Sequence, residues 1–272
     1  MRLCAVIVVY GQHYYNTNSF KSLEKIITTG LIELSVIIYD NSTCRESFDS
    51  VHKLIDVEYV HDCRNIGVVP AYQYAVKYCQ LNNISWLLRL DQDSLFDKEL
   101  IEYFLAIDKS NNLLAIVPKI LSNNLLVSPS YHHLGGRYTP IEIDKSGIVI
   151  SGITFINSMS FINVSSNIIT SILEKQKFML DLSDHELALA LPNNSIYVMD
   201  CFVSHSLSIT EDKYIPISRY KLILENEIQM IKQREGVLGS IIYKLRLIIR
   251  TLKFVYRGSF KLALLTVKSI IS

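Results

Sequence analysis

Apolar and polar residues alternate in blocks along the first hundred residues of the chain. Segments with helical spacing lie near residues 16–29, 45–54 and 69–82. Between them stand apolar runs that are rich in Val and Ile and too short for helices: Leu3–Tyr10, Ser35–Tyr39, the weaker Val57–Val60, and Ile84–Leu90. Strands that are apolar on both faces and alternate with helices are typical of a mostly parallel sheet covered by helices. The pattern therefore predicts an α/β fold.

The first apolar run has a second interpretation, as the core of a signal peptide. Only Arg2 precedes it as a positive residue, and Gly11-Gln12-His13 is not a small-residue cleavage site. We therefore interpret Leu3–Tyr10 as the first buried strand. No run approaches the roughly 18 uninterrupted apolar residues that a membrane-spanning helix needs, so none is predicted.

Polar residues follow each predicted strand at its carboxyl end, where open parallel sheets bind their ligands. They are Gly11-Gln12, Asp40-Asn41-Ser42, Arg64-Asn65-Ile66-Gly67 and Asp91-Gln92-Asp93-Ser94. An acid at Asp40 can accept hydrogen bonds from a base or ribose, and Asn65 and Gly67 can let the backbone approach a nucleotide. Asp91 and Asp93 can both reach Mg²⁺ or Mn²⁺, which take oxygen ligands. The positions predict a nucleotide and metal site.

Each motif taken alone has a simpler explanation. Asp-Asn-Ser and Asn-x-Gly are common turn sequences, and a lone Asp-x-Asp is common on surfaces. Their shared placement after successive strands favours a site. The sequence lacks a G-x-G-x-x-G after the first strand and a G-x-x-x-x-G-K-[ST] anywhere, so neither a Rossmann dinucleotide site nor a P-loop is predicted.

Several segments between residues 3 and about 226 match one known pattern. They are Val6–Tyr10, Ile37–Ser42, Asn65–Gly67, Leu90–Ser94, Ile156–Ser160, Phe178–Glu186 and His205–Leu207. In these segments the chain resembles the inverting glycosyltransferases of family 2, which have the GT-A fold. It is most similar to bacterial rhamnosyltransferase-like enzymes of O-antigen or capsule-type surface polysaccharide assembly. The resemblance implies a GT-A nucleotide-diphospho-sugar transferase fold with a mostly parallel central sheet flanked by helices.

The resemblance also implies a role for individual residues. Asp184 would be the general base, with Glu186 as the neighbouring acid. Asp93 and His205 would hold Mg²⁺ or Mn²⁺. The residues implied to bind the donor nucleotide are Tyr10, Asp40, Asn65, Gly67 and Asp91. The implied reaction moves a sugar, such as rhamnose from dTDP-rhamnose, from a nucleotide-sugar donor to a lipid-linked oligosaccharide acceptor.

The chain departs from the family pattern in its later half. Met159 and Ser208 stand where glycines are usual, Leu187–Ala190 replaces Trp-Cys-Leu-Arg, and Glu225 replaces an Arg. A non-catalytic scaffold with a transferase-like domain therefore remains an alternative. A nucleotidyltransferase is a weaker one, because it should carry a Gly-rich basic loop after the first strand.

Two segments near the proposed acceptor side have open interpretations. Asp184 could simply cap the helix that follows it, as could Ser183, and Asp181 is a rival base. The segment Tyr131–Arg137 suggests a loop over the donor or acceptor, with Gly135-Gly136 as its turn and Arg137 as a candidate contact to phosphate.

Charge changes the interpretation of the C-terminus. The 272 residues have a net charge of +1, but residues 1–231 carry −7 and residues 232–272 carry +8. Basic residues recur at helical spacing among apolar ones, which predicts either interfacial helices on an anionic membrane or packed helices with a solvated basic face. We expect a transferase domain over 1–216 and a membrane-associating helical arm over 217–272.

Composition limits the remaining possibilities. A hydrophobic content of 49% excludes a disordered chain. Five cysteines without a C-x-x-C spacing favour a reducing cytoplasm over a disulfide framework. No recognised nucleic-acid-binding module accompanies the basic tail, so we expect no nucleic-acid partner. The expected location is the cytoplasm, peripheral at the inner face of the bacterial plasma membrane.

Overall fold

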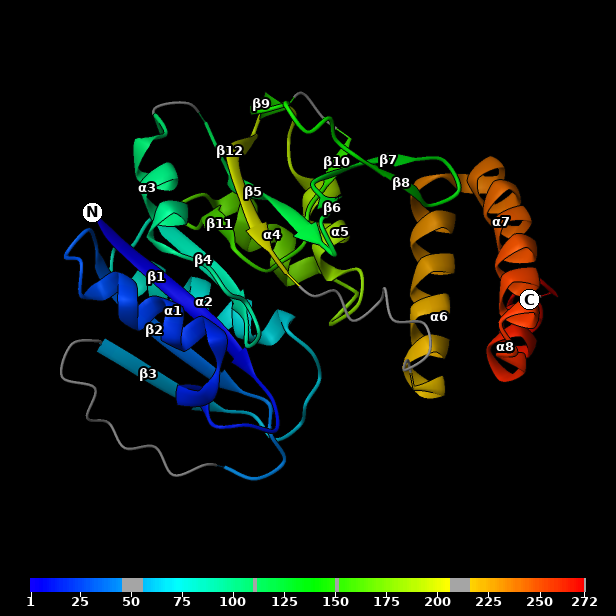
Figure 1. The fold of residues 1–272 in the computed structure, drawn as a ribbon, viewed down its shortest axis with the longest axis horizontal. Coiled ribbons are helices and arrows are strands. Elements are labelled where there is room, and N and C mark those ends of the chain that lie inside the picture. The colour runs from blue at the N-terminus through cyan, green and yellow to red at the C-terminus, as the bar shows by residue number, and fades with distance from the viewer. Residues whose placement is uncertain (46–55, 110–111, 150–151, 206–215, 272) are drawn as a thin grey trace. The chain divides into compact units, whose positions relative to one another are not determined.

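The computed structural model describes residues 1–45, 56–109, 112–149, 152–205 and 216–271 (Figure 1). The chain forms two compact units. The first contains residues 1–130 and 140–206, and the second contains residues 131–139 and 207–272. The expected division at residue 216 stays a prediction, because the unit boundary lies near residue 206 and a separate short segment belongs to the second unit. The expected helix at 45–54 lies outside the described residues, apart from residue 45.

The first unit alternates strands and helices over its first half, as the apolar pattern predicts. Its elements are β1 (Arg2–Val9), η1 (Tyr14–Asn16), α1 (Asn18–Ile27), β2 (Glu33–Asp40), β3 (Asp56–His61), α2 (Val69–Leu81), β4 (Trp86–Asp91), α3 (Lys98–Ala106), β5 (Ala115–Ser122), β6 (Leu125–Ser128), β9 (Gly147–Val149), β10 (Ile153–Thr154), β11 (Ser160–Asn163), α4 (Asn167–Lys175), α5 (Ser183–Ala190) and β12 (Ile196–Ser204). The four expected strands correspond to β1–β4.

All the strands of the first unit except β10 form one central sheet in the order β3-β2-β1-β4-β11-β5-β12-β9, with β6 paired to β5. The pairs among β3, β2, β1 and β4 are parallel, as is the β5–β12 pair, whereas β11 runs antiparallel between β4 and β5. The expected fold class is confirmed: an α/β structure with a mostly parallel sheet, flanking helices and C-terminal helices.

Both faces of β1 are buried, which explains its uninterrupted apolar sequence. Ile7 on one face belongs to the same core cluster as Phe20 of α1 and Phe104 of α3. On the other face, the thiol of Cys4 meets that of Cys79 in α2. Helices therefore cover β1 from both sides (Figure 1). This sandwich fixes the carboxyl ends of the parallel strands, where the candidate site lies.

The second unit contains three helices and a β-hairpin. The helices are α6 (Ile217–Arg234), α7 (Gly236–Tyr256) and α8 (Phe260–Ile271), and the hairpin strands are β7 (Ser130–His133) and β8 (Arg137–Pro140). The helices share a core that includes Tyr220, Leu247 and Leu262. Among the described residues, no helix combines the length and apolar character needed to cross a membrane.

Candidate active site

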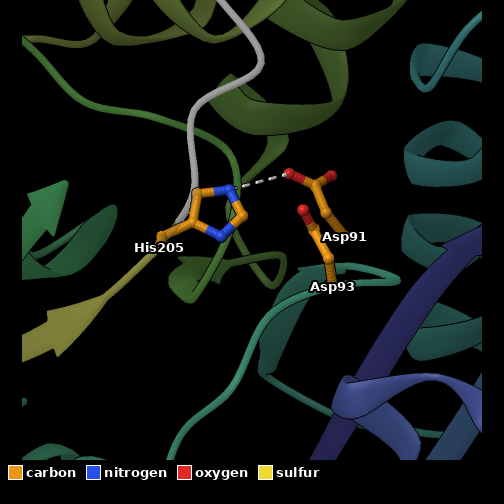
Figure 2. Close-up of side chains that lie close together, drawn as sticks. All are labelled: Asp91, Asp93 and His205. Carbon is orange, nitrogen blue, oxygen red and sulfur yellow. Dashed lines mark ion pairs between the residues drawn. The ribbon is translucent and has the colours of Figure 1, made fainter. Parts of the chain in front are cut away.

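Asp91, Asp93 and His205 come together at the carboxyl ends of β4 and β12 (Figure 2). One ligand atom from each residue lies within 4.8 Å of the others. His205 Nε2 is 3.8 Å from Asp91 Oδ2, which is too long for a hydrogen bond. The His205 imidazole is buried, and its Nδ1 has no partner in the described part of the chain. Two carboxylates and an imidazole fit a divalent cation such as Mn²⁺ or Mg²⁺.

The turn that presents the two carboxylates is held by the start of α1. The backbone N–H groups of Asn18 and Ser19 donate to Gln92 O at 3.0 and 3.5 Å. Ser19 Oγ donates to Asp91 O, and the Gln92 side-chain oxygen accepts from Tyr10 N at 2.8 Å. These bonds fix the turn between Asp91 and Asp93 before any ligand arrives, which lowers the ordering cost of binding.

The charge state of Asp91 reflects its crowded surroundings. Loss of water around the carboxylate raises the pKa of Asp91 to about 6, while the field of His205 opposes this rise. The negative charges of Asp93 and Asp184 raise it further, and Arg89 lowers it. Because Asp93 and Asp184 both repel a charge on Asp91, a bound cation would stabilise the ionised form of Asp91.

Asp184 lies within electrostatic reach of this cluster, from the first turn of α5. Its charge acts on Asp91, Tyr72 and Arg89. Helix α5 begins at Ser183, and its N-cap residue is Leu182, which provides no side-chain cap. The alternative in which Ser183 or Asp184 is the cap is therefore wrong. Asp184 Oδ1 accepts from His185 N at 2.8 Å, and the rival base Asp181 is buried.

Arg89 is a site residue that the sequence analysis missed. It is 2% exposed and lies two residues before Asp91 in β4. Its guanidinium lies over the ring of Tyr72, with its Cζ 5.0 Å from the ring centroid. Burial lowers the pKa of Arg89, and the charges of Tyr72, Asp184 and Asp91 oppose that effect. A charged residue inside an otherwise apolar strand was the signal that could have revealed it.

Arg89 also connects the strand of the candidate metal site to the helix of Asp184. Its Nη1 donates to Asn157 Oδ1 at 2.5 Å, and Asn157 Nδ2 donates to Ser183 Oγ at 3.1 Å. Ser183 is the first residue of α5, and its backbone carbonyl accepts from Gln176 Nε2 at 2.6 Å. Arg89 Nη2 and the Tyr72 hydroxyl are buried and have no hydrogen-bond partner among the described residues.

The loop with Asn65 and Gly67 packs against the segment before α5. Asn65 has a φ of 47° and Gly67 a φ of 114°, both in the left-handed half of the map. Asn41 Nδ2 donates to Gly67 O at 2.9 Å, and Val68 N donates to Met179 O at 2.7 Å. The two segments that the sequence assigns to the donor and to the base are therefore in backbone contact.

Asp40 and Tyr10 lie at the same edge of the sheet. Asp40 is buried, and its carboxylate accepts from Ser42 N at 2.8 Å and from the Tyr59 hydroxyl at 2.5 Å. Its present contacts hold the turn after β2, so a contact between Asp40 and a nucleoside stays a prediction. Tyr10 is 53% exposed, and its contact with the donor nucleotide stays a prediction.

Glu186 has a structural contact that the sequence does not reveal. Its carboxylate accepts from the backbone N–H groups of Lys177, at 3.0 Å to the nearer oxygen, and of Phe178, at 3.2 Å. This holds the loop between α4 and α5. A catalytic role for Glu186 stays a prediction.

Met159 shows why glycine is usual at its position in the resembled family. The residue has a φ of 62°, a conformation that glycine adopts without strain. Its N–H donates to Arg89 O at 2.7 Å, and its side chain is buried in the main core. The backbone at Met159 therefore adopts a glycine-like conformation beside Arg89.

No protein-family model and no curated protein matches the chain. Among solved structures, it is similar to S. aureus TarS 1-349, with a TM-score of 0.49, 15% identity, and coverage of 90% of this chain and 70% of that one. The complex of TarS 1-349 with UDP-GlcNAc gives a TM-score of 0.48, 13% identity and coverage of 86% and 71%. GalNAc-T7 with UDP, GalNAc and Mn²⁺ gives a TM-score of 0.47 and 11% identity, with coverage of 76% of this chain and 44% of that one. All three TM-scores are below 0.5.

Proposed function

We propose that the chain is a metal-dependent, inverting glycosyltransferase that uses a nucleotide-sugar donor. The observation that carries the proposal is the convergence of Asp91, Asp93 and His205 at the carboxyl end of a mostly parallel sheet, with Asp184 in electrostatic reach. This is the edge at which open α/β sheets bind ligands. Asp93, His205 and Asp91 would hold Mn²⁺ or Mg²⁺, which when bound neutralises charge on a leaving diphosphate.

The acceptor side of the reaction needs a base. Asp184 Oδ1 is engaged by His185 N, so we assign proton uptake from the acceptor hydroxyl to Oδ2. The acceptor oxygen then forms a bond to the anomeric carbon as the bond from that carbon to the diphosphate breaks. Because the attack comes from the face opposite the leaving group, the configuration inverts. The diphosphate leaves without protonation, so one carboxylate base suffices.

Donor recognition would use the other residues at this edge of the sheet. The carboxyl ends of β1, β2 and β3 are followed or formed by Tyr10, by Asp40, and by Asn65 and Gly67, respectively. We propose that they contact the nucleoside, and that Asp91, beside the metal, also lies near the ribose and diphosphate. Rhamnose from dTDP-rhamnose as the donor sugar, and a lipid-linked glycan of O-antigen or capsule type as the acceptor, follow from the resemblance alone.

We further propose that the second unit associates with an anionic membrane at the cytoplasmic face. Helix α7 packs Leu247 and Phe254 into its core and exposes a second apolar stripe, made of Leu238, Ile241, Leu245, Ile248, Ile249, Leu252 and Val255. At 100° per residue, Lys244 and Lys253 lie at opposite margins of this stripe. An apolar face edged by lysines is the pattern of a helix lying in a lipid interface.

A screen of nucleotide release from nucleotide-sugars, with Mn²⁺, Mg²⁺ or a chelator, tests the catalytic proposal. We expect release that needs the metal and falls at least about a hundredfold in Asp93→Asn and Asp184→Asn. Asp97→Asn removes the same charge outside the cluster and serves as the control. Metal-dependent release that survives both site substitutions would favour another site. No release with any donor would favour the non-catalytic scaffold.

A further inference from the structure

The tip of the β7–β8 hairpin is built into the helices of the second unit. Gly135 and Gly136 have φ values of 72° and 61°, which form the tight turn. A Cβ on Gly135 would lie 2.5 Å from Ile242 Cγ2, and one on Gly136 would lie 2.9 Å from Ile231 Cδ1. The expected Gly-Gly turn is therefore present, and its glycines allow close packing against α6 and α7.

The carboxylate of Glu235 holds the tip of the hairpin through hydrogen bonds. It accepts from the N–H groups of Gly135 and Gly136 and lies 3.1 Å from His132 Nε2. Arg246 Nη1 donates to Gly135 O. Glu235 is the only acid after residue 231, and its side chain is 5% exposed. Its carboxylate therefore contacts the hairpin rather than solvent.

An open groove of about 830 Å³ lies between the hairpin and α7. It is lined by His133, Leu134, Arg137, Thr139, Ile242 and Arg246. Two of these side chains are guanidiniums and one is an imidazole, and no acid is among them. Arg137 is exposed and forms no hydrogen bond or ion pair with the described residues. Such forks of donors match the oxygens of a phosphate.

The groove continues into the exposed apolar stripe of α7. Ile242 lines the groove, and Leu238, Ile241, Leu245 and Ile249 lie three or four positions from it or from one another along the helix. Residues at these spacings share one side of a helix. A cationic groove next to an apolar stripe complements a ligand with an anionic head and a hydrocarbon tail.

We propose that this groove binds the terminal phosphate or diphosphate of a lipid, with the lipid chain along the α7 stripe. Arg137 and Arg246 donate to the phosphate oxygens, and His133 Nδ1 is available as a third contact because its Nε2 meets Thr139 Oγ1 at 2.6 Å. The inference rests on the membrane association proposed above and narrows it to one headgroup chemistry. It explains why Arg137 has no protein acceptor in the part of the chain that the structure describes.

Vesicle flotation with the full chain tests the proposal. Phosphatidylcholine vesicles carrying phosphatidic acid present a terminal phosphate, and phosphatidylglycerol vesicles of matched surface charge present a phosphodiester. We expect preference for phosphatidic acid, and Arg137→Gln should lower that binding about tenfold. Lys268→Gln, which removes an exposed charge from α8, should weaken both kinds of binding slightly and equally. Equal binding of both vesicles by the unaltered chain would overturn the proposal, as would equal losses in the two variants.

Two further measurements identify the source of the phosphate and guard against misfolding. Titration with diphosphate in solution should show weak binding that Arg137→Gln abolishes; binding as tight as that to vesicles would assign the groove to a soluble anion and overturn the lipid assignment. Circular dichroism should show an intact fold in Arg137→Gln. Flotation needs no activity, so a failed donor screen leaves this test intact.

Discussion

A Cβ atom on Gly67 would lie 2.1 Å from the carbonyl oxygen of Met179. The glycine is therefore required by contact as well as by its φ of 114°. We expect Gly67→Ala to lower the free energy of unfolding by about 2–4 kcal/mol, from backbone strain and overpacking together. Gly30→Ala is the matched control, because Gly30 has a φ of 69° and open space around its Cβ position, and it should cost only about 1 kcal/mol. Urea denaturation measures the free energy of unfolding of both variants. Equal losses would show that the Met179 carbonyl moves away from the added Cβ at little cost.

Metal binding should depend on Asp93. We expect Mn²⁺ affinity, measured by calorimetry or by the electron paramagnetic resonance of free Mn²⁺, to fall at least about tenfold in Asp93→Asn, because one anionic oxygen ligand is lost. Mn²⁺ should bind more tightly than Mg²⁺, since the imidazole of His205 suits a transition metal better. Asp97→Asn should bind as the unaltered chain does. Unchanged affinity in Asp93→Asn would place the ion elsewhere.

Asp91 should make the metal-free protein less stable near neutral pH. Burial raises its pKa to about 6, above the value of roughly 3.9 in an unfolded chain, so the folded state binds the proton more tightly. The protonated Asp91 carboxyl therefore contributes to the free energy of unfolding at low pH, and this contribution is lost as the pH rises through 6. With chelator present, Asp91→Asn should melt higher than the unaltered chain at pH 7, and the gap should close towards pH 4. The side chain is 37% exposed, so screening limits the effect to about 1 kcal/mol. A gap that widens on acidification would contradict the sign.

Asn157 should be essential to the buried chain from Arg89 to Ser183. Asn157→Leu leaves Arg89 Nη1 buried without its acceptor, which we expect to cost about 3 kcal/mol of unfolding free energy. Asn157→Asp keeps an acceptor for Arg89 and loses only the bond to Ser183 Oγ, so it should be the more stable of the two. Denaturation midpoints measure the stability of the two variants. If Asn157→Asp were the less stable, the hydrogen bond to Ser183 Oγ would contribute more to stability than the one from Arg89.

Membrane association should depend on the exposed stripe of α7. Leu245→Glu and Leu252→Glu should each lower binding to phosphatidylglycerol vesicles about tenfold, because an apolar contact is replaced by a repelled charge. Leu81→Glu is the matched control, as Leu81 is 84% exposed and lies in the first unit. Point substitutions are preferable to truncation near residue 235, which would remove the α7 side chain that covers Gly135. Equal binding by all three variants would exclude the stripe from the interface.

The parallel half of the fold could be predicted because strands buried on both faces leave uninterrupted apolar runs, as in β1 and β4. The strand order could not, since the antiparallel insertion of β11 between β4 and β5 depends on pairing between residues far apart in the chain. Asp91 and Asp93 were predicted from their place after a strand. His205 was reached only through resemblance, because 112 residues separate it from Asp93 and periodicity does not encode their meeting.

The remaining differences arise where a local pattern has a distant partner. The Gly135-Gly136 turn was predicted, whereas its fit against Ile242 depends on tertiary packing. A position of this segment over the donor or acceptor stays a prediction. Likewise the basic tail was counted as exposed charge. Arg250 instead pairs with Glu227, with Nη1 2.7 Å from a carboxylate oxygen, and Arg246 bonds to the hairpin backbone.

The hairpin also limits how the C-terminal helices can be exchanged by recombination. Residues 131–139 pack with a unit whose other residues begin at 207, so the unit is discontinuous in sequence. A crossover near residue 207 would pair a foreign α7 with the resident Gly135, and any larger neighbour than Ile242 would collide with it. Exchange of the helices together with residues 131–139 would keep the Gly135–Ile242 contact, so chimeras built with two junctions should be more stable than single-junction chimeras.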